Sequence, residues 1–129
     1  MMRIALIVVF SLLLGACWQR DIGRSYYPSG KLRSEATVKN TVVDGAAVMY
    51  YENGKKMGEA GYRGGVLDGK SVAYYESGAR KAEAEYKAGV LHGRSISWSE
   101  TGAVLSTVQF DNGRLLTPPE NESAAIPKK

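Results

Sequence analysis

The stretch Tyr50-Tyr51-Glu52-Asn53-Gly54 decides the fold, because it returns at a fixed distance along the chain. It reappears as Tyr74-Tyr75-Glu76-Ser77-Gly78, and weaker copies stand one period before and one period after the pair. The glycines of the four copies recur every 24 residues, at Gly30, Gly54, Gly78 and Gly102. A fixed period of this length is typical of stacked supersecondary units that pack against their neighbours.

Large side chains keep the same register in two more columns. One column holds Tyr50, Tyr74 and Trp98, and the other holds Val38, Tyr62, Tyr86 and Phe110. Agreement of so many columns indicates a repeat domain over residues 25–116. The polar, proline-bearing stretch 117–129 is predicted to be a disordered tail.

The repeat unit is predicted to be a β-hairpin. Residues 80–86 alternate between small or aromatic and charged side chains, which is the period of a half-buried strand. Ala, Glu and Lys would also suit a helix. The equivalent segments 32–38 and 104–110 contain more β-branched residues, and repeats share one conformation, so a strand is preferred.

We therefore predict an all-β chain, an array of about four antiparallel hairpins. Asn53-Gly54 suits a tight turn that needs positive φ at two positions. A glycine-rich return turn is expected over residues 64–69, with Leu67 and its equivalent Leu91 tucked beneath the turns.

The strand before the tight turn has two faces. The face with Val48 and Tyr50 is predicted to be the core face, on which aromatic side chains lie across small residues of the return strands. Tyr51 and Tyr75 then lie on the outer face and are candidate partner-binding residues, because exposed tyrosines are common binding anchors. The alternative, that they only pack against neighbouring strands, is equally well supported.

The N-terminus predicts export. A basic start is followed by an apolar stretch, residues 4–14, whose helix would rise only about 16 Å and would not cross a bilayer of about 30 Å. This pattern is typical of a signal peptide, residues 1–16. Leu14-Gly15-Ala16-Cys17 resembles the bacterial lipobox, which implies lipid attachment at Cys17 and a tether over residues 17–24. Trp18 after the cysteine weakly favours the outer membrane.

Catalysis and nucleic-acid binding have little support in the sequence. The formal net charge is +4, and charges of both signs alternate without a basic cluster. The lone histidine, His92, stands in a column with Asp44 and Asp68, which indicates a turn residue, and the nearby serines fill a wet face. No zinc-binding spacing and no phosphate loop is present. We expect no enzyme activity, no cofactor and no metal.

The unit Tyr-Tyr-Glu-Asn-Gly, followed by Lys55-Lys56, Glu59, Tyr62, Gly65 and Leu67-Asp68-Gly69, resembles the bacterial variant of the MORN repeat. The resemblance implies a β-hairpin array that binds membranes, lipids or proteins, and it implies no catalytic residues. Such repeats are often found in proteins named as antitoxins of toxin–antitoxin systems. The fourth unit departs from the pattern at Trp98-Ser99 and at Thr107, which fits a capping repeat.

Two functions remain open from the sequence. The first is a lipid-anchored module that binds a protein partner, either a toxin met in the envelope or another envelope protein. The second is a structural envelope lipoprotein that organises membrane or wall by self-association as a homo-oligomer, which would also cover an otherwise open sheet.

Overall fold

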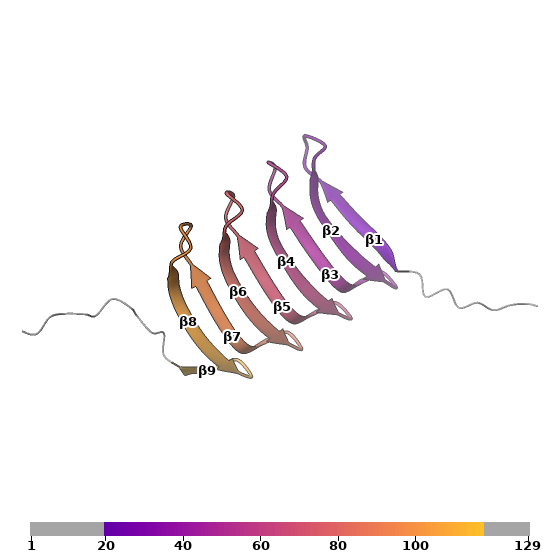
Figure 1. The fold of residues 1–129 in the computed structure, drawn as a ribbon. Coiled ribbons are helices and arrows are strands. Elements are labelled where there is room, and N and C mark those ends of the chain that lie inside the picture. The colour runs from indigo at the N-terminus through magenta and orange to yellow at the C-terminus, as the bar shows by residue number, and fades with distance from the viewer. Residues whose placement is uncertain (1–19, 118–129) are drawn as a thin grey trace, which may run out of the picture.

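The computed structural model describes residues 20–117, and these residues form one sheet of nine antiparallel strands in chain order (Figure 1). The strands are β1 (Asp21–Tyr26), β2 (Leu32–Lys39), β3 (Val42–Tyr50), β4 (Lys56–Arg63), β5 (Val66–Tyr74), β6 (Arg80–Lys87), β7 (Val90–Trp98), β8 (Val104–Asp111) and β9 (Arg114–Thr117). The predicted all-β hairpin array is confirmed.

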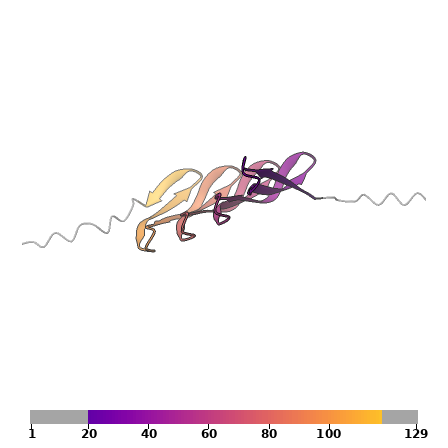
Figure 2. The ribbon, with the colours of Figure 1, turned by 90° about the horizontal axis from the view of Figure 1, so that it is seen from above.

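The sheet is a single elongated layer, as the view from above shows (Figure 2). Each strand pairs only with the strands next to it in sequence. Val72, 7% exposed, is the only buried hydrophobic residue in the described part of the chain. The array therefore has no two-layered core, and its stability depends on contacts between neighbouring hairpins.

The hairpin turn of each unit is a three-residue loop. In the second unit the N–H of Gly54 donates to the carbonyl oxygen of Tyr51 at 2.9 Å, and the N–H of Tyr51 donates to that of Lys55 at 2.8 Å. Gly54 has φ of 86°, whereas Asn53 does not have a positive φ. The prediction of two positive φ angles was wrong for this turn, because a three-residue loop needs the left-handed conformation only at its last residue.

The return turn is the one that has positive φ at both central residues. Gly64 and Gly65 have φ of 55° and 82°, which is the signature of a two-residue type I′ turn. This turn matches the twist of the strands, so pairing resumes at once and β5 begins at Val66. The predicted turn over 64–69 was too long, and Leu67 does not lie beneath it but pairs with Tyr62 in the sheet.

The return turns also join one repeat to the next. The N–H of Gly65 donates to the carbonyl oxygen of Val43 at 2.8 Å, and Gly89 and Gly113 make the same bond to Leu67 and Leu91. A Cβ at Gly65 would stand 2.8 Å from Cγ1 of Val42. The column of glycines thus serves two needs, a left-handed backbone and close approach to the preceding valine.

The sheet extends slightly beyond the predicted repeat domain at both ends. Residues 21–24 were expected in the tether, but they belong to β1 and pair with β2 from Asp21 onwards. Thr117, expected in the tail, is the last residue of β9. These short segments pair with parts of the neighbouring long strands, β2 and β8.

The two faces differ in composition from what the sequence suggested. Val72 pairs directly with Glu59 on β4 and Glu83 on β6, and directly paired residues share a face. The small residues of the return strands pair instead with the opposite face, as Ala60 does with Ala47. The predicted aromatic ladder over small residues is therefore wrong. The cross-strand register places the valines and Tyr50 beside glutamates, on what we term the valine–glutamate face, and leaves a separate small-residue face.

Candidate functional site

Tyrosine hydroxyls tie consecutive repeats together beside the hairpin turns. Tyr51 donates from its hydroxyl to the carbonyl oxygen of Tyr74 at 2.7 Å, and Tyr75 donates to that of Trp98 at 2.9 Å. Tyr27 makes the equivalent bond to Tyr50 at 2.7 Å. Both candidate residues, Tyr51 and Tyr75, are half-buried. Their hydroxyls thus have a structural role, while partner binding through their rings stays a prediction.

The fourth repeat ends this series of bonds. Ser99 stands in the tyrosine column, and its Oγ accepts the N–H of Ala103 at 3.1 Å within its own turn. A serine side chain is too short to reach across to another repeat. The last unit therefore differs from the others in the residue that makes the contact between repeats, as expected of a terminal unit.

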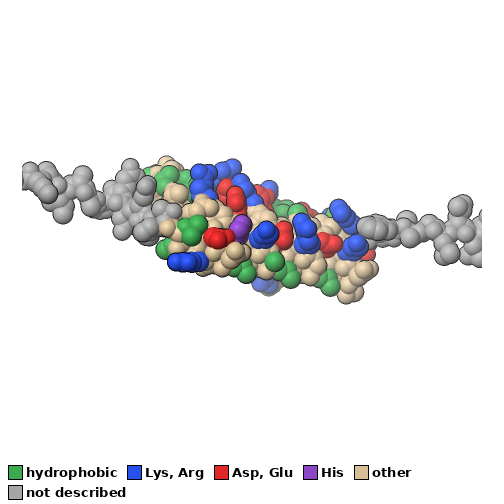
Figure 3. Space-filling view, turned by 90° about the horizontal axis from the view of Figure 1, so that it is seen from below, with side chains coloured by type: hydrophobic (Ala, Val, Ile, Leu, Met, Phe, Trp, Pro, Cys, Tyr) green, Lys and Arg blue, Asp and Glu red, His purple; other side chains and the backbone are tan. Residues whose placement is uncertain are grey.

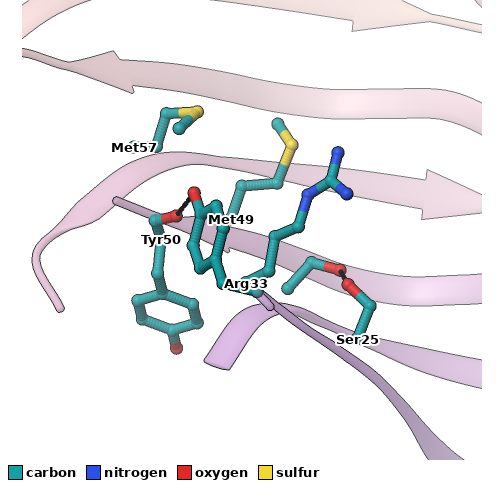
Figure 4. A pocket seen from close by; sticks show the side chains of 7 residues that line it. Ser25, Arg33, Met49, Tyr50 and Met57 are labelled. Carbon is teal, nitrogen blue, oxygen red and sulfur yellow. Dashed lines mark hydrogen bonds between the residues drawn. The ribbon is translucent and has the colours of Figure 1, made fainter. Parts of the chain in front are cut away.

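A hollow of about 510 Å³ lies where the first two repeats meet (Figure 4). Met49, Met57 and Arg33 extend from one side of the sheet, and the ring of Tyr50 extends from the other. Cζ of Arg33 lies 6.0 Å from the centroid of the Tyr27 ring. We call this the methionine hollow; it is lined by Ser25, Tyr27, Arg33, Ser34, Met49, Tyr50 and Met57.

The methionine hollow was missed by the sequence analysis. Met49 is 53% exposed, although its equivalents in the next two repeats are the small residues Ala73 and Ser97. Met57 is the equivalent of Lys81, whose Nζ lies 5.5 Å from the centroid of the Tyr75 ring. The signal was present as two methionines: Met49 stands in a column of small residues, and the equivalents of Met57 in the adjacent repeats are the cations Arg33 and Lys81.

Glutamates on the valine–glutamate face are held by tyrosines and cations. Tyr74 donates from its hydroxyl to Oε1 of Glu59 at 2.7 Å, and Nζ of Lys56 lies 2.7 Å from Oε2. The hydrogen bonds from Lys56 and then Tyr74 lower the pKa of Glu59 below its usual value. The hydrogen bond to Glu59 raises the pKa of Tyr74. At neutral pH the glutamate is therefore ionised and the tyrosine is protonated.

The hydrogen bond between tyrosine and glutamate is also present one repeat earlier but is missing one repeat later. Tyr50 donates to Oε1 of Glu35 at 2.9 Å, and this hydrogen bond raises the pKa of Tyr50. Trp98 has no hydroxyl for Glu83, the next member of the glutamate column. Glu83, whose side chain is 14% exposed, lies instead 2.8 Å from Nζ of Lys70 and 3.6 Å from Nη1 of Arg80. Nε of Arg24 lies 3.4 Å from Oε2 of Glu35, so each of these three glutamates has a cation beside it.

His92 contacts the return turn of the following repeat. Its Nδ1 accepts the N–H of Asn112 at 3.4 Å and lies 3.3 Å from Oδ1 of Asp111. Asp68 accepts the N–H of Ala88 at 3.4 Å, which is the same bond one repeat earlier. The column therefore supports return turns. Seen from below, side chains of both charges alternate along a line that includes the histidine (Figure 3).

Several predicted features cannot be placed. Cys17 and the signal peptide lie outside the described residues, as does the tail beyond Thr117. Within residues 20–117, no group of three His, Cys, Asp or Glu side chains could hold a metal ion. The described part of the chain has no helix long and apolar enough to cross a membrane.

These features define the class of the protein: an open array of β-hairpin repeats, in which hydrogen bonds at the hairpin turns and at the return turns connect consecutive units. The family model of the MORN repeat variant matches residues 22–40, 43–63 and 67–88. Three segments of the chain are thus similar to the MORN repeat variant, and MORN repeats are in general protein- or membrane-binding modules. No curated protein and no solved structure gives a match.

Proposed function

We propose that this chain is a lipid-anchored module that binds a protein partner through the small-residue face of its repeat array. The MORN repeats support a binding role. The anchor rests on Leu14-Gly15-Ala16-Cys17, which resembles a lipobox. The proposed mode of action is contact with a partner, which is supported by the structural links that Glu59, Asp68 and His92 make within or between repeats.

The methionine hollow is the observation that carries the proposal. Met49 and Met57 offer flexible, polarisable surface that adapts to a partner side chain. Arg33 adds a cation at the rim, and arginine and tyrosine are both enriched among residues that contribute most to binding. The partner that fits is a protein surface with an apolar side chain next to an acidic group.

A toxin in the cell envelope is the partner that best fits both the methionine hollow and the predicted lipid anchor. A protein exported and attached by Cys17 would meet its target outside the cytoplasm. An immunity-like role against an incoming toxin satisfies both the antitoxin names of similar repeat proteins and the predicted location, with the outer membrane weakly favoured. Neutralisation would occur by covering the toxin surface.

The binding test compares variants on the two faces of the array. Envelope extracts would be passed over the immobilised wild-type chain and over a Met49→Ser, Arg33→Gln variant. We expect the variant to lose the partner, because it removes the apolar contact and the cation together. Lys70→Gln is the matched control, since it changes a charge on the valine–glutamate face. Equal capture by all three proteins, with circular dichroism showing folded chains, would exclude the methionine hollow.

The anchor has its own test. Mass spectrometry of the protein from bacterial membranes should show an N-terminus at Cys17 that carries acyl chains. Cys17→Ser should release the protein from the membrane fraction, because its attachment would then lack the thioether-linked lipid. An uncleaved, unacylated chain in the native host would contradict the proposed attachment.

A further inference from the structure

The outer edge of β8 is only partly paired. β9 pairs with β8 at Gln109, Phe110 and Asp111, near one end of the strand. The rest of that edge, residues 104–108, has no strand beside it in the described part of the chain. By contrast, β7 pairs with β8 along nearly the whole strand, from Val104 to Phe110. An unpaired edge of this kind is a template for another strand.

β1 and β9 are complementary parts of one repeat strand. β1 pairs with β2 from Asp21 to Tyr26, in the register with which β3 pairs with β4 from Gly45 to Tyr50. β1 is therefore equivalent to the second part of β3. β9 follows its two-residue turn as β3 does and is equivalent to residues 42–45, the first part. Together the two short strands would cover one strand of the array, with a single shared position, that of Gly45, to which both Thr117 and Asp21 correspond.

Apolar side chains are exposed where these two ends would meet. Tyr26 on β1 is 57% exposed, although the equivalent Tyr50 and Tyr74 are half-buried by neighbouring repeats. Leu105 on β8 is also 57% exposed. Further exposed hydrophobic residues gather at the same two ends of the array: Ile22, Val104, Leu115 and Leu116. Addition of a strand at this edge would cover them, as the internal repeats do for their own residues.

We propose that β1 of a second copy of this chain adds to the free edge of β8, so that copies associate head to tail. By the internal register of β2 with β3, Ser106 would face Ser25 of the second copy, and Thr107 would face Arg24 of the second copy. The 24-residue period then continues across the junction. Because this contact uses different surfaces on the two copies, a third copy can add in the same way, and association does not stop at a dimer.

The chain's own tail is the competing occupant of this edge. In the repeat register, Pro118 and Pro119 stand where the added strand would have Ile22 and Gly23. Proline has no N–H to donate to a strand pair, so this sequence disfavours pairing of the tail. The junction between copies would still be weaker than an internal one, because Ser99 cannot supply the tyrosine hydroxyl bond. Association should therefore depend on concentration.

Directed disulfide formation tests the register. All variants would be made in the full chain with Cys17→Ser, so that the introduced thiols are the only ones. A mixture of Ser25→Cys and Ser106→Cys proteins should give the mixed disulfide dimer under mild oxidation, because paired positions on one face have suitable geometry. The matched control mixes Arg24→Cys with Ser106→Cys, which lie on opposite faces, and should lose this product. Equal yields in both mixtures would overturn the proposal.

Two more measurements show whether a second copy or the chain's own tail occupies the edge of β8. A Ser106→Cys, Asn121→Cys chain that closes an internal disulfide would show that the tail fills the edge and would overturn the proposal. Analytical ultracentrifugation of the full chain with Cys17→Ser, which cannot carry the thioether-linked lipid, should show a mean mass that keeps rising with concentration beyond the dimer. A mass that stays monomeric, or that stops at a dimer, contradicts open head-to-tail association. No partner protein takes part, so these outcomes are independent of the proposed binding function.

Discussion

The hydroxyl of Tyr51 should contribute measurably to the stability of the array. Tyr51→Phe keeps the ring and removes only the 2.7 Å hydrogen bond to the carbonyl oxygen of Tyr74. A neutral hydrogen bond of this type contributes about 1 kcal/mol to the free energy of unfolding. Tyr75→Phe removes the bond of the next junction, so the double variant should lose about 2 kcal/mol if the junctions act independently.

Urea unfolding followed by circular dichroism gives the measurement. With a denaturant slope of about 1–3 kcal/mol per molar, a loss of 1 kcal/mol lowers the urea midpoint by about 0.3–1 M. The matched control is Tyr86→Phe, because the Tyr86 hydroxyl has no hydrogen bond to the described residues. Its midpoint should stay at the wild-type value.

Two results would refute this reasoning. If Tyr51→Phe unfolds at the wild-type midpoint, the hydroxyl bond between repeats contributes nothing to stability. If Tyr86→Phe loses as much as Tyr51→Phe, the effect comes from the general loss of a hydroxyl. The same variants separate the two roles of these tyrosines, because a phenylalanine ring can still contact a partner protein.

Two further changes test the turn and the glutamate contacts. Gly65→Ala should destabilise the chain more than Gly54→Ala. Both substitutions place a side chain at positive φ, which costs about 1–2 kcal/mol, but only the Cβ at residue 65 meets Val42, at 2.8 Å. Val42→Ala should recover part of that difference in urea unfolding. Because the pKa of Glu59 is lowered in the folded chain, its stabilisation is present above the unfolded pKa and is lost as pH falls through the folded pKa. Glu59→Gln should flatten the acid side of a plot of urea midpoint against pH, and an unchanged slope would count against the contacts with Lys56 and Tyr74.

Most of the fold could be predicted from the repeat period. Successive copies of Gly54 and of the Tyr50 column required neighbouring hairpins of the same shape, and the alternation over residues 80–86 identified a strand in spite of its helix-forming composition. The repeat period could not predict which residues of neighbouring strands lie on the same face of the sheet. That arrangement depends on cross-strand register, which pairs Val72 with Glu59 and is set by bulges and turns.

The candidate site was only partly predictable for a similar reason. Alternation placed Tyr51 on the face opposite Tyr50, but the spacing between adjacent repeats brings its hydroxyl to the Tyr74 carbonyl oxygen. The methionine hollow depends on side chains from four consecutive strands, β1 to β4, including Arg33, Met49 and Met57. A periodic sequence indicates what the repeats share. This hollow depends on Met49 and Met57, which differ from the equivalent residues of the other repeats.

The order of the strands also determines how the molecule responds to tension. β1 and β9 lie at opposite ends of the array, and antiparallel hydrogen bonds run perpendicular to the strands, along the line between those ends (Figure 1). A force between a membrane attachment at one end and a load at the other would open these bonds a few at a time, as in unzipping, and would not shear them all together. Under such a force the array would therefore extend in steps, one hairpin at a time.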